Sequence, residues 1–261
     1  MIKYAKLSVD VQQYESIIRT QLKNKTEIQE QFIGSRRKLY SEGVMIATLS
    51  TTTHLDIGKI TKQQFNSFLG GFTKQLYKQL KEKPGLLSLH IDFDKSSRAK
   101  NYYNWDKLSV GDFFYNIDLN SAYWQVAHKL EYLTDKMYES YIDLDEYKMV
   151  KRLCVSFLAR TNKRKYYSDD ETFEIKCDTS ALQQIYRNIR YYLYNVIAES
   201  VALTDEWIEY NIDGITVLNS DVDKIQKFFD ENEYKYKITE CRKLSDVEYL
   251  YGNKVRKFRN R

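Results

Sequence analysis

The sequence is poor in cysteine and histidine and has no long apolar run, and each shortage excludes a class of protein. Its three cysteines stand far apart, which argues against a disulfide framework and for a reducing compartment. Its three histidines are too scattered to suggest a zinc site. We find no signal peptide, no apolar run of membrane-spanning length and no repeat. We therefore expect a soluble intracellular, cytoplasmic protein without a membrane partner.

Aromatic and charged residues are plentiful instead. Tyrosine alone accounts for 23 of the 261 residues, so the composition is not that of a disordered chain. The length allows one large domain or two small ones with a sizeable core. A net charge of +5 mildly favours an anionic partner, although ordinary solvated lysine faces give similar values.

Hydrophobic periodicity predicts an α+β fold in which helices cover an antiparallel sheet. Residues 9–32 are polar and helix-prone, and 61–82 form an amphipathic helical pattern that ends before a break at 83–85. We expect a polar loop and a soft boundary within 95–111. Strands are predicted at 86–93, 113–119, 174–177 and 234–240, helices at 121–141, 145–160, 180–203 and 222–232, and a hairpin with an Asp213-Gly214 tip at 207–218.

The segment YNIDLNSAYW, residues 115–124, places an acid where a strand gives way to a helix. Asn120 or Ser121 can cap that helix, whose first-turn N–H groups then point outward. A cation held by Asp118 would bridge to phosphates in front of those amides. The alternative is that Asn-Ser is simply a good cap with an acid nearby.

A second acid, Asp213, precedes Gly214. The two residues lie between segments in which apolar residues alternate with polar ones. Asp-Gly is first of all a hairpin turn signal. If the hairpin pairs with strand 113–119, however, Asp118 and Asp213 converge. Two carboxylates so close repel unless cations neutralise them, which is how two-metal phosphoryl-transfer sites are built.

A basic segment lies between the two acids. From Lys151 to Lys165 the chain carries no acidic residue. Lysines on one helix face suit a triphosphate, and the basic cluster with Tyr166 and Tyr167 suits a nucleic-acid backbone and stacked bases. The alternative is a solvated surface helix. The basic residues of this segment are Lys151, Arg152, Arg160, Lys163, Arg164 and Lys165.

In order and register these segments resemble the palm domain of family B DNA polymerases, especially the protein-primed and viral or organellar kind. DLNSAYW at 118–124 is similar to motif A, KRLCVSFLA at 151–159 to motif B, and NIDGITV at 211–217 to motif C. The resemblance covers roughly residues 110–245. It implies a palm-like polymerase domain over 106–261, strongly reduced. From their helical patterns, residues 1–105 are expected to form a largely helical accessory region.

The resemblance also implies residue roles. Asp118, Asp213 and the Leu119 carbonyl would bind two Mg²⁺ or Mn²⁺ ions, and the two acids would be catalytic. Backbone amides near Ser121, Ala122 and Tyr123 would hold the triphosphate. Lys151 would lie beside the phosphates, and Tyr123 would be a steric gate against a ribose 2′-OH. Arg160, Lys163, Arg164 and Lys165 would bind nucleic acid.

The expected function is therefore extension of DNA from dNTPs on a template and primer. A second polymerase subunit or a priming protein is a further expected partner, and a phage or plasmid origin is compatible. Val155 and Ala159 differ from the residues of motif B, and Asn211 differs from the first acid of motif C. These differences favour another hypothesis, a palm-derived nucleic-acid-binding or structural protein without catalysis. A reverse-transcriptase-like enzyme is disfavoured because YNID lacks an adjacent acid pair.

One further acid pair falls outside the resemblance. HIDFD at 90–94 would place Asp92 and Asp94 on one strand face, which hints at an exonuclease site. The further acids of such a site are missing, so an ordinary strand is the preferred interpretation.

Overall fold

The computed structural model describes residues 8–33, 36–50, 57, 59–93, 102–159, 162–167, 172–176 and 181–258. The chain divides into two compact units. Unit 1 comprises Met1–Ile57 with Ser156–Tyr186, and unit 2 comprises Gly58–Val155 with Arg187–Arg261. The boundary expected near residue 105 lies inside unit 2, and the accessory and polymerase roles assigned to its two sides stay predictions.

Unit 1 is built on a six-stranded sheet in the order β1-β4-β3-β2-β7-β8. Its pairs are antiparallel except β1–β4, which is parallel. Helix α1 (Val11–Lys23) begins with a capping box between Asp10 and Gln13. Its Tyr14 packs in one core cluster with Ile28, Leu39 and Leu49 of the sheet. The strands are β1 (Ser8–Val9), β2 (Ile28–Ile33), β3 (Arg36–Ser41), β4 (Val44–Ser50), β7 (Asn162–Tyr167) and β8 (Thr172–Lys176).

The expectation of a largely helical N-terminal region is wrong, because strands β1–β4 form a sheet with α1 before α2 begins. The helix-prone segment 9–32 contains α1 and then most of β2. The strand signal of β2 is hidden because Glu30 occupies a core-facing position between Ile28 and Phe32. That carboxylate is 2% exposed and accepts a 2.8 Å hydrogen bond from the Tyr167 hydroxyl. A buried, paired carboxylate thus replaces an apolar residue in the alternation.

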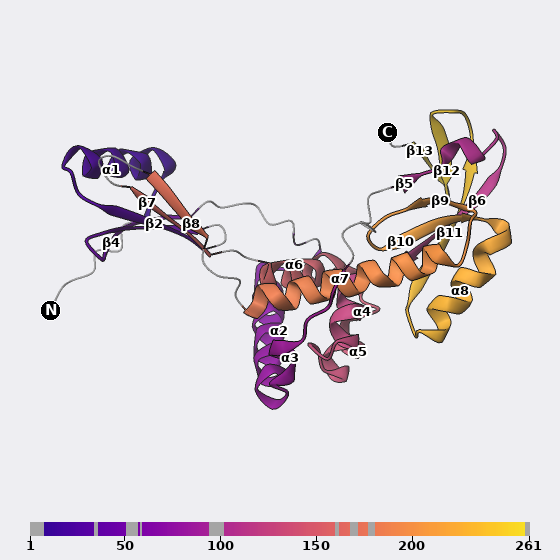
Figure 1. Cartoon of the computed structure of the whole chain (residues 1–261), viewed down its shortest axis with the longest axis horizontal. Coiled ribbons are helices and arrows are strands. Elements are labelled where there is room, and N and C mark those ends of the chain that lie inside the picture. The colour runs from indigo at the N-terminus through magenta and orange to yellow at the C-terminus, as the bar shows by residue number, and fades with distance from the viewer. Residues whose placement is uncertain are drawn as a thin grey trace. The chain divides into compact units, whose positions relative to one another are not determined.

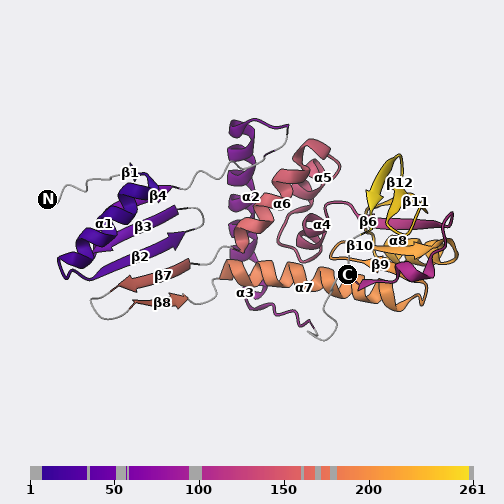
Figure 2. The same cartoon turned by 90° about the horizontal axis from the view of Figure 1, so that it is seen from above.

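Unit 2 contains a seven-stranded antiparallel sheet in the order β13-β12-β11-β6-β10-β9-β5 (Figure 1). The strands are β5 (Tyr102–Tyr103), β6 (Phe113–Leu119), β9 (Trp207–Tyr210), β10 (Gly214–Leu218), β11 (Tyr236–Lys243), β12 (Glu248–Tyr251) and β13 (Lys254–Lys257). The helices are α2 (Lys62–Glu82), α3 (Gly85–Ser88), α4 (Ala122–Lys129), α5 (Asp135–Tyr141), most of α6 (Lys148–Leu158), much of α7 (Ala181–Ala202) and α8 (Val222–Glu231). Figure 2 shows the same elements from above.

The two faces of the seven-stranded sheet differ in chemistry. On one face Ile117, Ile215 and Val217 are fully buried. Helix α8 covers that face, and its Phe229 ring lies 5.6 Å from the ring of Tyr236 on β11. Side chains alternate across a strand, so Asp118 belongs to the opposite face. This opposite face, called the polar face below, carries the candidate site around Asp118, and the buried Phe114 and Cys241 belong to a second core cluster farther along it.

Most predicted elements are confirmed, namely the amphipathic helix, strand 113–119, helix 180–203, the hairpin and the strand starting near 236. The helix expected over 121–141 is instead two helices, α4 and α5. Between them the backbone turns at Glu131, with φ 59°, and Thr134 caps α5. No proline or glycine marks this break, so the sequence pattern continues across it.

The strand expected at 86–93 is wrong. Residues 85–88 form the short helix α3, and 89–93 pair with no strand among the described residues. The Asn188 amide replaces a partner strand, donating to the Leu89 carbonyl at 2.8 Å and accepting from the Ile91 amide at 3.2 Å. Asp92 is exposed beside His90, and Asp94 lies outside the described residues, so nothing supports the acid pair.

Within the described part of the chain, no helix is both long and apolar enough to cross a membrane.

Candidate functional site

The pairing of β6 with β10 brings the two predicted acids together. Asp118 lies opposite Gly214 in this antiparallel pair, so Asp213 is one residue from the acid across the sheet. The Leu119 amide donates a 2.8 Å hydrogen bond to the Asp213 carbonyl oxygen. The expected pairing of the hairpin with strand 113–119 is therefore confirmed, and it sets both carboxylates at one end of adjacent strands.

The tip of the hairpin differs from the predicted Asp213-Gly214 turn. Gly214 is the first residue of β10, and residues 211–213 make the turn. The Asn211 side-chain oxygen accepts a hydrogen bond from the Asp213 amide at 3.1 Å, and the Asn211 amide donates to the Gly214 carbonyl at 3.0 Å. Asparagine commonly forms such turns. Asn211 therefore supports Asp213 structurally.

Gly214 has a different role from the one its turn signal indicates. A Cβ atom there would lie 2.8 Å from the Ile117 carbonyl oxygen and 3.1 Å from Asp118 Oδ1. The first of these is a backbone atom and cannot move independently of β6. The missing side chain therefore leaves the space that the Asp118 carboxylate occupies.

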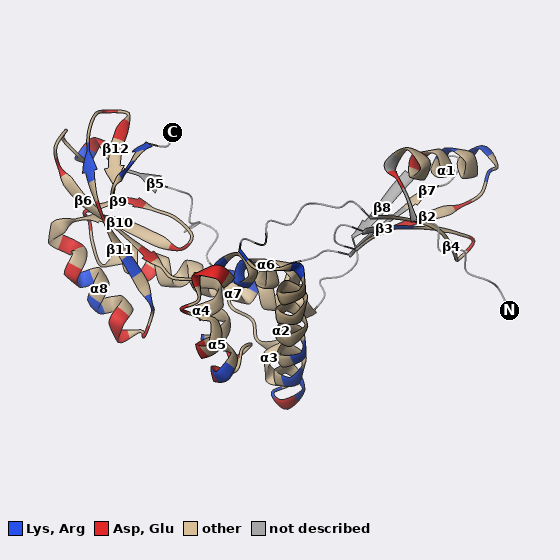
Figure 3. Cartoon of the chain, turned by 180° about the vertical axis from the view of Figure 1, so that it is seen from behind, with Lys and Arg blue, Asp and Glu red and all other residues tan. Residues whose placement is uncertain are grey.

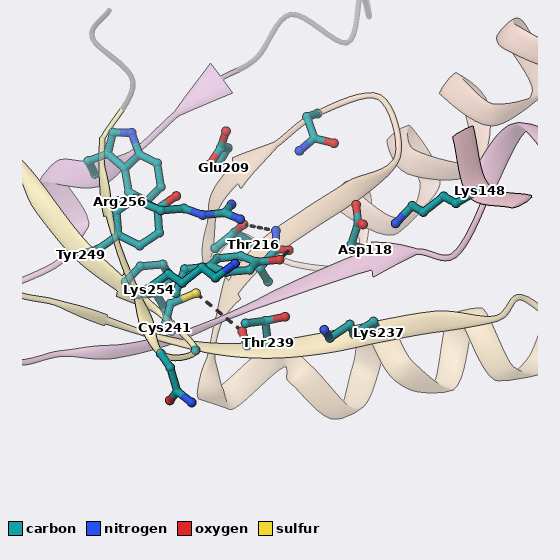
Figure 4. A pocket seen from close by; sticks show the side chains of 17 residues that line it. Asp118, Lys148, Glu209, Thr216, Lys237, Thr239, Cys241, Tyr249, Lys254 and Arg256 are labelled. Atoms are coloured by element: carbon teal, nitrogen blue, oxygen red, sulfur yellow. Dashed lines mark hydrogen bonds between the residues drawn. The ribbon is translucent and has the colours of Figure 1, made fainter. Parts of the chain in front are cut away.

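The electrostatic field at Asp118 is unusual for a carboxylate. Burial, and secondly the charge of Asp213, raise the pKa of Asp118 to about 6. Lys148, Arg256 and Lys237 act in the opposite direction. Figure 4 shows Lys148 extending toward Asp118, and Lys237 lying along the strand below it. The structure thus holds two repelling carboxylates within a field of cations, an arrangement that a divalent ion would stabilise.

The corner between β6 and α4 is held by backbone geometry and by one buried amide. Ser121 occupies the N-cap position with φ 50° and ψ 45°, and its side chain makes no capping hydrogen bond. The Gln125 side-chain amide instead holds the loop between β6 and α4, donating hydrogen bonds to the carbonyl oxygens of Asn120 (2.7 Å) and Lys235 (2.6 Å). The expected side-chain cap is therefore absent, and Gln125, which sequence reasoning missed, positions the loop after Asp118.

A pocket of about 520 Å³ lies in front of this corner. All four predicted nucleotide-binding residues line it, with Lys148 and Arg152 of α6 as exposed cations on its wall. Tyr123 also lines it and is partly buried. The full lining is Asp118, Leu119, Ser121, Ala122, Tyr123, Trp124, Lys148, Met149, Lys151, Arg152, Asn211, Ile212 and Asp213.

Lys151 lines this pocket, but its ammonium group is already engaged. Nζ donates to the carbonyl oxygens of Tyr141 (2.7 Å) and Ile142 (2.8 Å) at the end of α5. The side chain is 2% exposed, and burial lowers the pKa of Lys151 to about 8. Its assignment to a triphosphate stays a prediction. Lys148, one turn earlier on the same face, offers a more accessible charge.

A second pocket of about 580 Å³ lies on the polar face of the sheet and shares Asp118, Lys148 and Asn211 with the first. It extends from Asp118 to the β12–β13 hairpin (Figure 4). Sequence reasoning did not foresee it, because residues of six strands, of α6 and of several turns line it.

The predicted nucleic-acid-binding residues belong to unit 1. Arg160 lies outside the described residues. Lys163, Arg164 and Lys165 are consecutive residues of β7, where the backbone pairs with β2 and β8. Their role in binding stays a prediction.

The donor set near Asp118 fits a hard divalent cation in type. Two carboxylates and a backbone carbonyl are the oxygen ligands that Mg²⁺ or Mn²⁺ accept. In the described ranges no group of three or more His, Cys, Asp or Glu side chains is placed to hold a metal. A cation at Asp118 and Asp213 would therefore take its remaining ligands from backbone, water or substrate.

The chain matches no protein-family model, no curated protein and no solved structure. The resemblance to the palm domain of family B DNA polymerases thus rests on the residues of the three segments alone.

Proposed function

We propose that unit 2 is a reduced palm-type DNA polymerase that extends DNA from dNTPs by metal-dependent phosphoryl transfer. The observation that carries the proposal is that Asp118, near the end of β6, lies beside Asp213 in the turn before β10, with a hydrogen bond from the Leu119 amide to the Asp213 carbonyl. These are the residues at which the sequence resembles motifs A and C. The antiparallel sheet with helices on one face agrees with such a palm.

In this proposal Asp118, Asp213 and the Leu119 carbonyl would hold two Mg²⁺ or Mn²⁺ ions. Such ions would lower the pKa of the attacking hydroxyl and offset the negative charge of the departing pyrophosphate. The contribution of the chain is rigidity. Asn211 fixes the Asp213 amide, Gly214 leaves room for Asp118, and Gln125 fixes the loop between β6 and α4.

The 520 Å³ pocket is the proposed dNTP site. Lys148 and Arg152 face it as exposed cations and would attract the triphosphate. Backbone amides of residues 121–123 at the start of α4 would add the favourable field of a helix N-terminus. Tyr123, on the wall of the same pocket, is the proposed gate against ribonucleotides.

Primer extension tests the proposal. The purified full chain is incubated with a primed DNA template, Mg²⁺ or Mn²⁺ and all four dNTPs. We expect extension by the wild type and its loss in Asp118→Asn and in Asp213→Asn. Asp223→Asn, which alters an exposed acid on α8, is the matched control and retains activity. Extension by both site variants at the wild-type rate contradicts the proposal.

The second candidate is a palm-derived nucleic-acid-binding protein without catalysis. Three observations favour it: the Lys151 ammonium is engaged by backbone carbonyls, Asn211 replaces an acid, and Val155 of motif B is buried. This candidate predicts DNA binding but no incorporation with either cation. If activity appears only on adding a second polymerase subunit or a priming protein, the first proposal holds with that partner.

A further inference from the structure

The pocket on the polar face of the seven-stranded sheet carries an excess of positive charge. Four cationic and two carboxylate side chains line its 580 Å³. The carboxylates are Asp118 and Glu209, and the cations are Lys148, Lys237, Lys254 and Arg256. They come from α6, β11 and β13, so the fold gathers them although the sequence spreads them over more than a hundred residues.

These four cations differ from other basic residues of unit 2. Among the described residues, none of the four forms an ion pair with a carboxylate. By contrast, Lys235 pairs with Asp143 at 2.6 Å and Lys243 pairs with Asp246 at 3.2 Å. Helix α8 likewise mixes acidic and basic residues along its length (Figure 3). Two carboxylates only partly offset four cations, and a polyanion would reduce the repulsion among these cations.

Aromatic rings form much of the rest of the pocket. Trp105, Phe114, Tyr249 and Tyr251 line it. Trp105 stacks on Tyr249 with ring centroids 5.8 Å apart, and Arg256 lies 3.7 Å over the centre of the Tyr251 ring. Aromatic rings beside a cationic groove are how proteins hold single-stranded nucleic acid, because bases stack while phosphates meet Lys and Arg.

The pocket is also preorganised. The Tyr251 hydroxyl donates to Asn116 Oδ1 at 3.1 Å, and Asn116 Nδ2 donates to Thr216 Oγ1 at 3.0 Å. Phe258 packs on Trp105 at 4.4 Å and on Tyr249 at 4.8 Å, which fastens the end of the β12–β13 hairpin to the sheet. A site fixed before binding loses less entropy when a ligand arrives.

We propose that the β12–β13 hairpin and β11 form a binding site for a single-stranded nucleic-acid segment that ends beside Asp118. Lys237, Lys254 and Arg256 bind its phosphates, and the tyrosine and tryptophan rings contact its bases. The role of this strand as a substrate rests on the proposed function. Its binding does not, because it is measured without catalysis.

The test is fluorescence anisotropy of a short labelled single-stranded oligodeoxynucleotide with the full chain in EDTA, over a series of salt concentrations. The double variant Lys237→Gln/Arg256→Gln removes two pocket cations. Its matched control, Arg242→Gln/Lys257→Gln, removes the same net charge from the same two strands on the other face, where both residues are exposed.

We expect the pocket variant to bind severalfold more weakly than the control, with a log–log salt slope reduced by about 0.7 for each phosphate that it no longer binds. Photocrosslinking with an iododeoxyuridine-substituted strand is expected to label the peptide that contains Tyr249 and Tyr251. Equal weakening in the two double variants overturns the inference, as does crosslinking confined to unit 1.

Two further binding measurements define the ligand. Duplex DNA that loses as much affinity in the pocket variant as the single strand overturns the single-strand assignment. If a free dNTP competes with the labelled strand as strongly as an unlabelled oligonucleotide does, the pocket binds a mononucleotide. That result also overturns the single-strand assignment. Pocket-dependent binding without any primer extension rejects the proposed function alone, and extension without pocket-dependent binding rejects the inference alone.

Discussion

The Leu119 amide donates a 2.8 Å hydrogen bond to the carbonyl oxygen of Asp213. This bond joins the residue after the first acid to the second acid itself. The backbone of Asp213, in the turn before β10, is thus held to the backbone at the end of β6. A cation that binds both acids would therefore meet them at a fixed spacing.

The charge of Asp118 is expected to destabilise the metal-free protein. Burial and the neighbouring Asp213 charge both disfavour the ionised carboxylate. Asp118→Asn removes that charge with little change of shape, so we expect its melting temperature in EDTA at neutral pH to rise by a few degrees. Asp223→Asn, on the exposed first turn of α8, is the control and is expected to show no rise. A melting temperature below that of the wild type contradicts the prediction.

Gly214→Ala is expected to damage the site and the sheet together. The new Cβ would meet the Ile117 carbonyl oxygen at 2.8 Å, which is closer than packing allows. We expect a loss of about 1–3 kcal/mol in the free energy of unfolding, measured by chemical denaturation. Gly70→Ala in the middle of α2, where no atom lies within 4 Å, is the control. It is expected to gain about 0.5–1 kcal/mol. Equal effects at both positions refute the packing argument.

Lys151 is expected to make stability depend on pH in the alkaline range. Its pKa in the folded protein is about 8, against an ordinary value of 10.5, so the unfolded chain binds more protons between these values. Its contribution to the free energy of unfolding therefore rises as pH increases from about 8 toward 10.5. Lys151→Met is expected to lose this rise, and to lose about 1–3 kcal/mol because two carbonyls lose their donor.

The control for Lys151 is Lys148→Met, which alters an exposed lysine of the same helix. Urea denaturation of the three proteins across this pH range gives the comparison. The prediction is wrong if Lys151→Met keeps the wild-type slope.

These residues also show which parts of the structure are predictable from the sequence. The strand 113–119 and the helix Ala181–Ala202 carry clear periodicity, which predicts them almost to their ends. The β2 strand escapes prediction because the buried Glu30 interrupts its alternation. Both acids of the candidate site are predictable, because turn and cap signals surround them.

Tertiary contacts account for the features of the site that the sequence does not predict. Lys148 and Lys151 lie on one helix face, and spacing cannot reveal that only the second reaches the carbonyls at the end of α5. The pocket beneath the β12–β13 hairpin gathers side chains from distant segments. Gly214 has the sequence pattern of a turn residue, whereas its contact with Asp118 exists only in the paired sheet.

Tyr123 is expected to select against ribonucleotides if the chain polymerises. Its ring lines the proposed dNTP pocket, where it would collide with a 2′-OH. The wild type should strongly prefer dNTPs, and Tyr123→Ala should gain rNTP incorporation. Tyr77→Ala, at a 56% exposed tyrosine of α2, is the control. Equal use of rNTPs and dNTPs by the wild type excludes the gate and favours a primase-like activity.

The basic strand β7 is expected to contribute salt-dependent nucleic-acid binding. Lys163, Arg164 and Lys165 lie within a chain segment that has no acid from 151 to 165. Changing all three to Gln should reduce the log–log salt slope by about one for each phosphate that the variant no longer binds. The control changes Lys62, Lys74 and Lys81 of α2, which are exposed and carry the same charge. Salt-insensitive binding, or equal weakening in both triple variants, would assign the β7 cluster to an ordinary solvated surface.

The central claim is that Asp118 and Asp213 together bind the divalent cations of a nucleotidyl-transfer site. It is tested most directly by titrating Mn²⁺ into the full chain in the presence of a dNTP and following free Mn²⁺ by electron paramagnetic resonance. The account predicts that the wild type takes up Mn²⁺ beyond the amount bound by the dNTP alone, and that Asp118→Asn and Asp213→Asn each lose this uptake while Asp223→Asn retains it. Uptake that is the same in the wild type and in both site variants would contradict it.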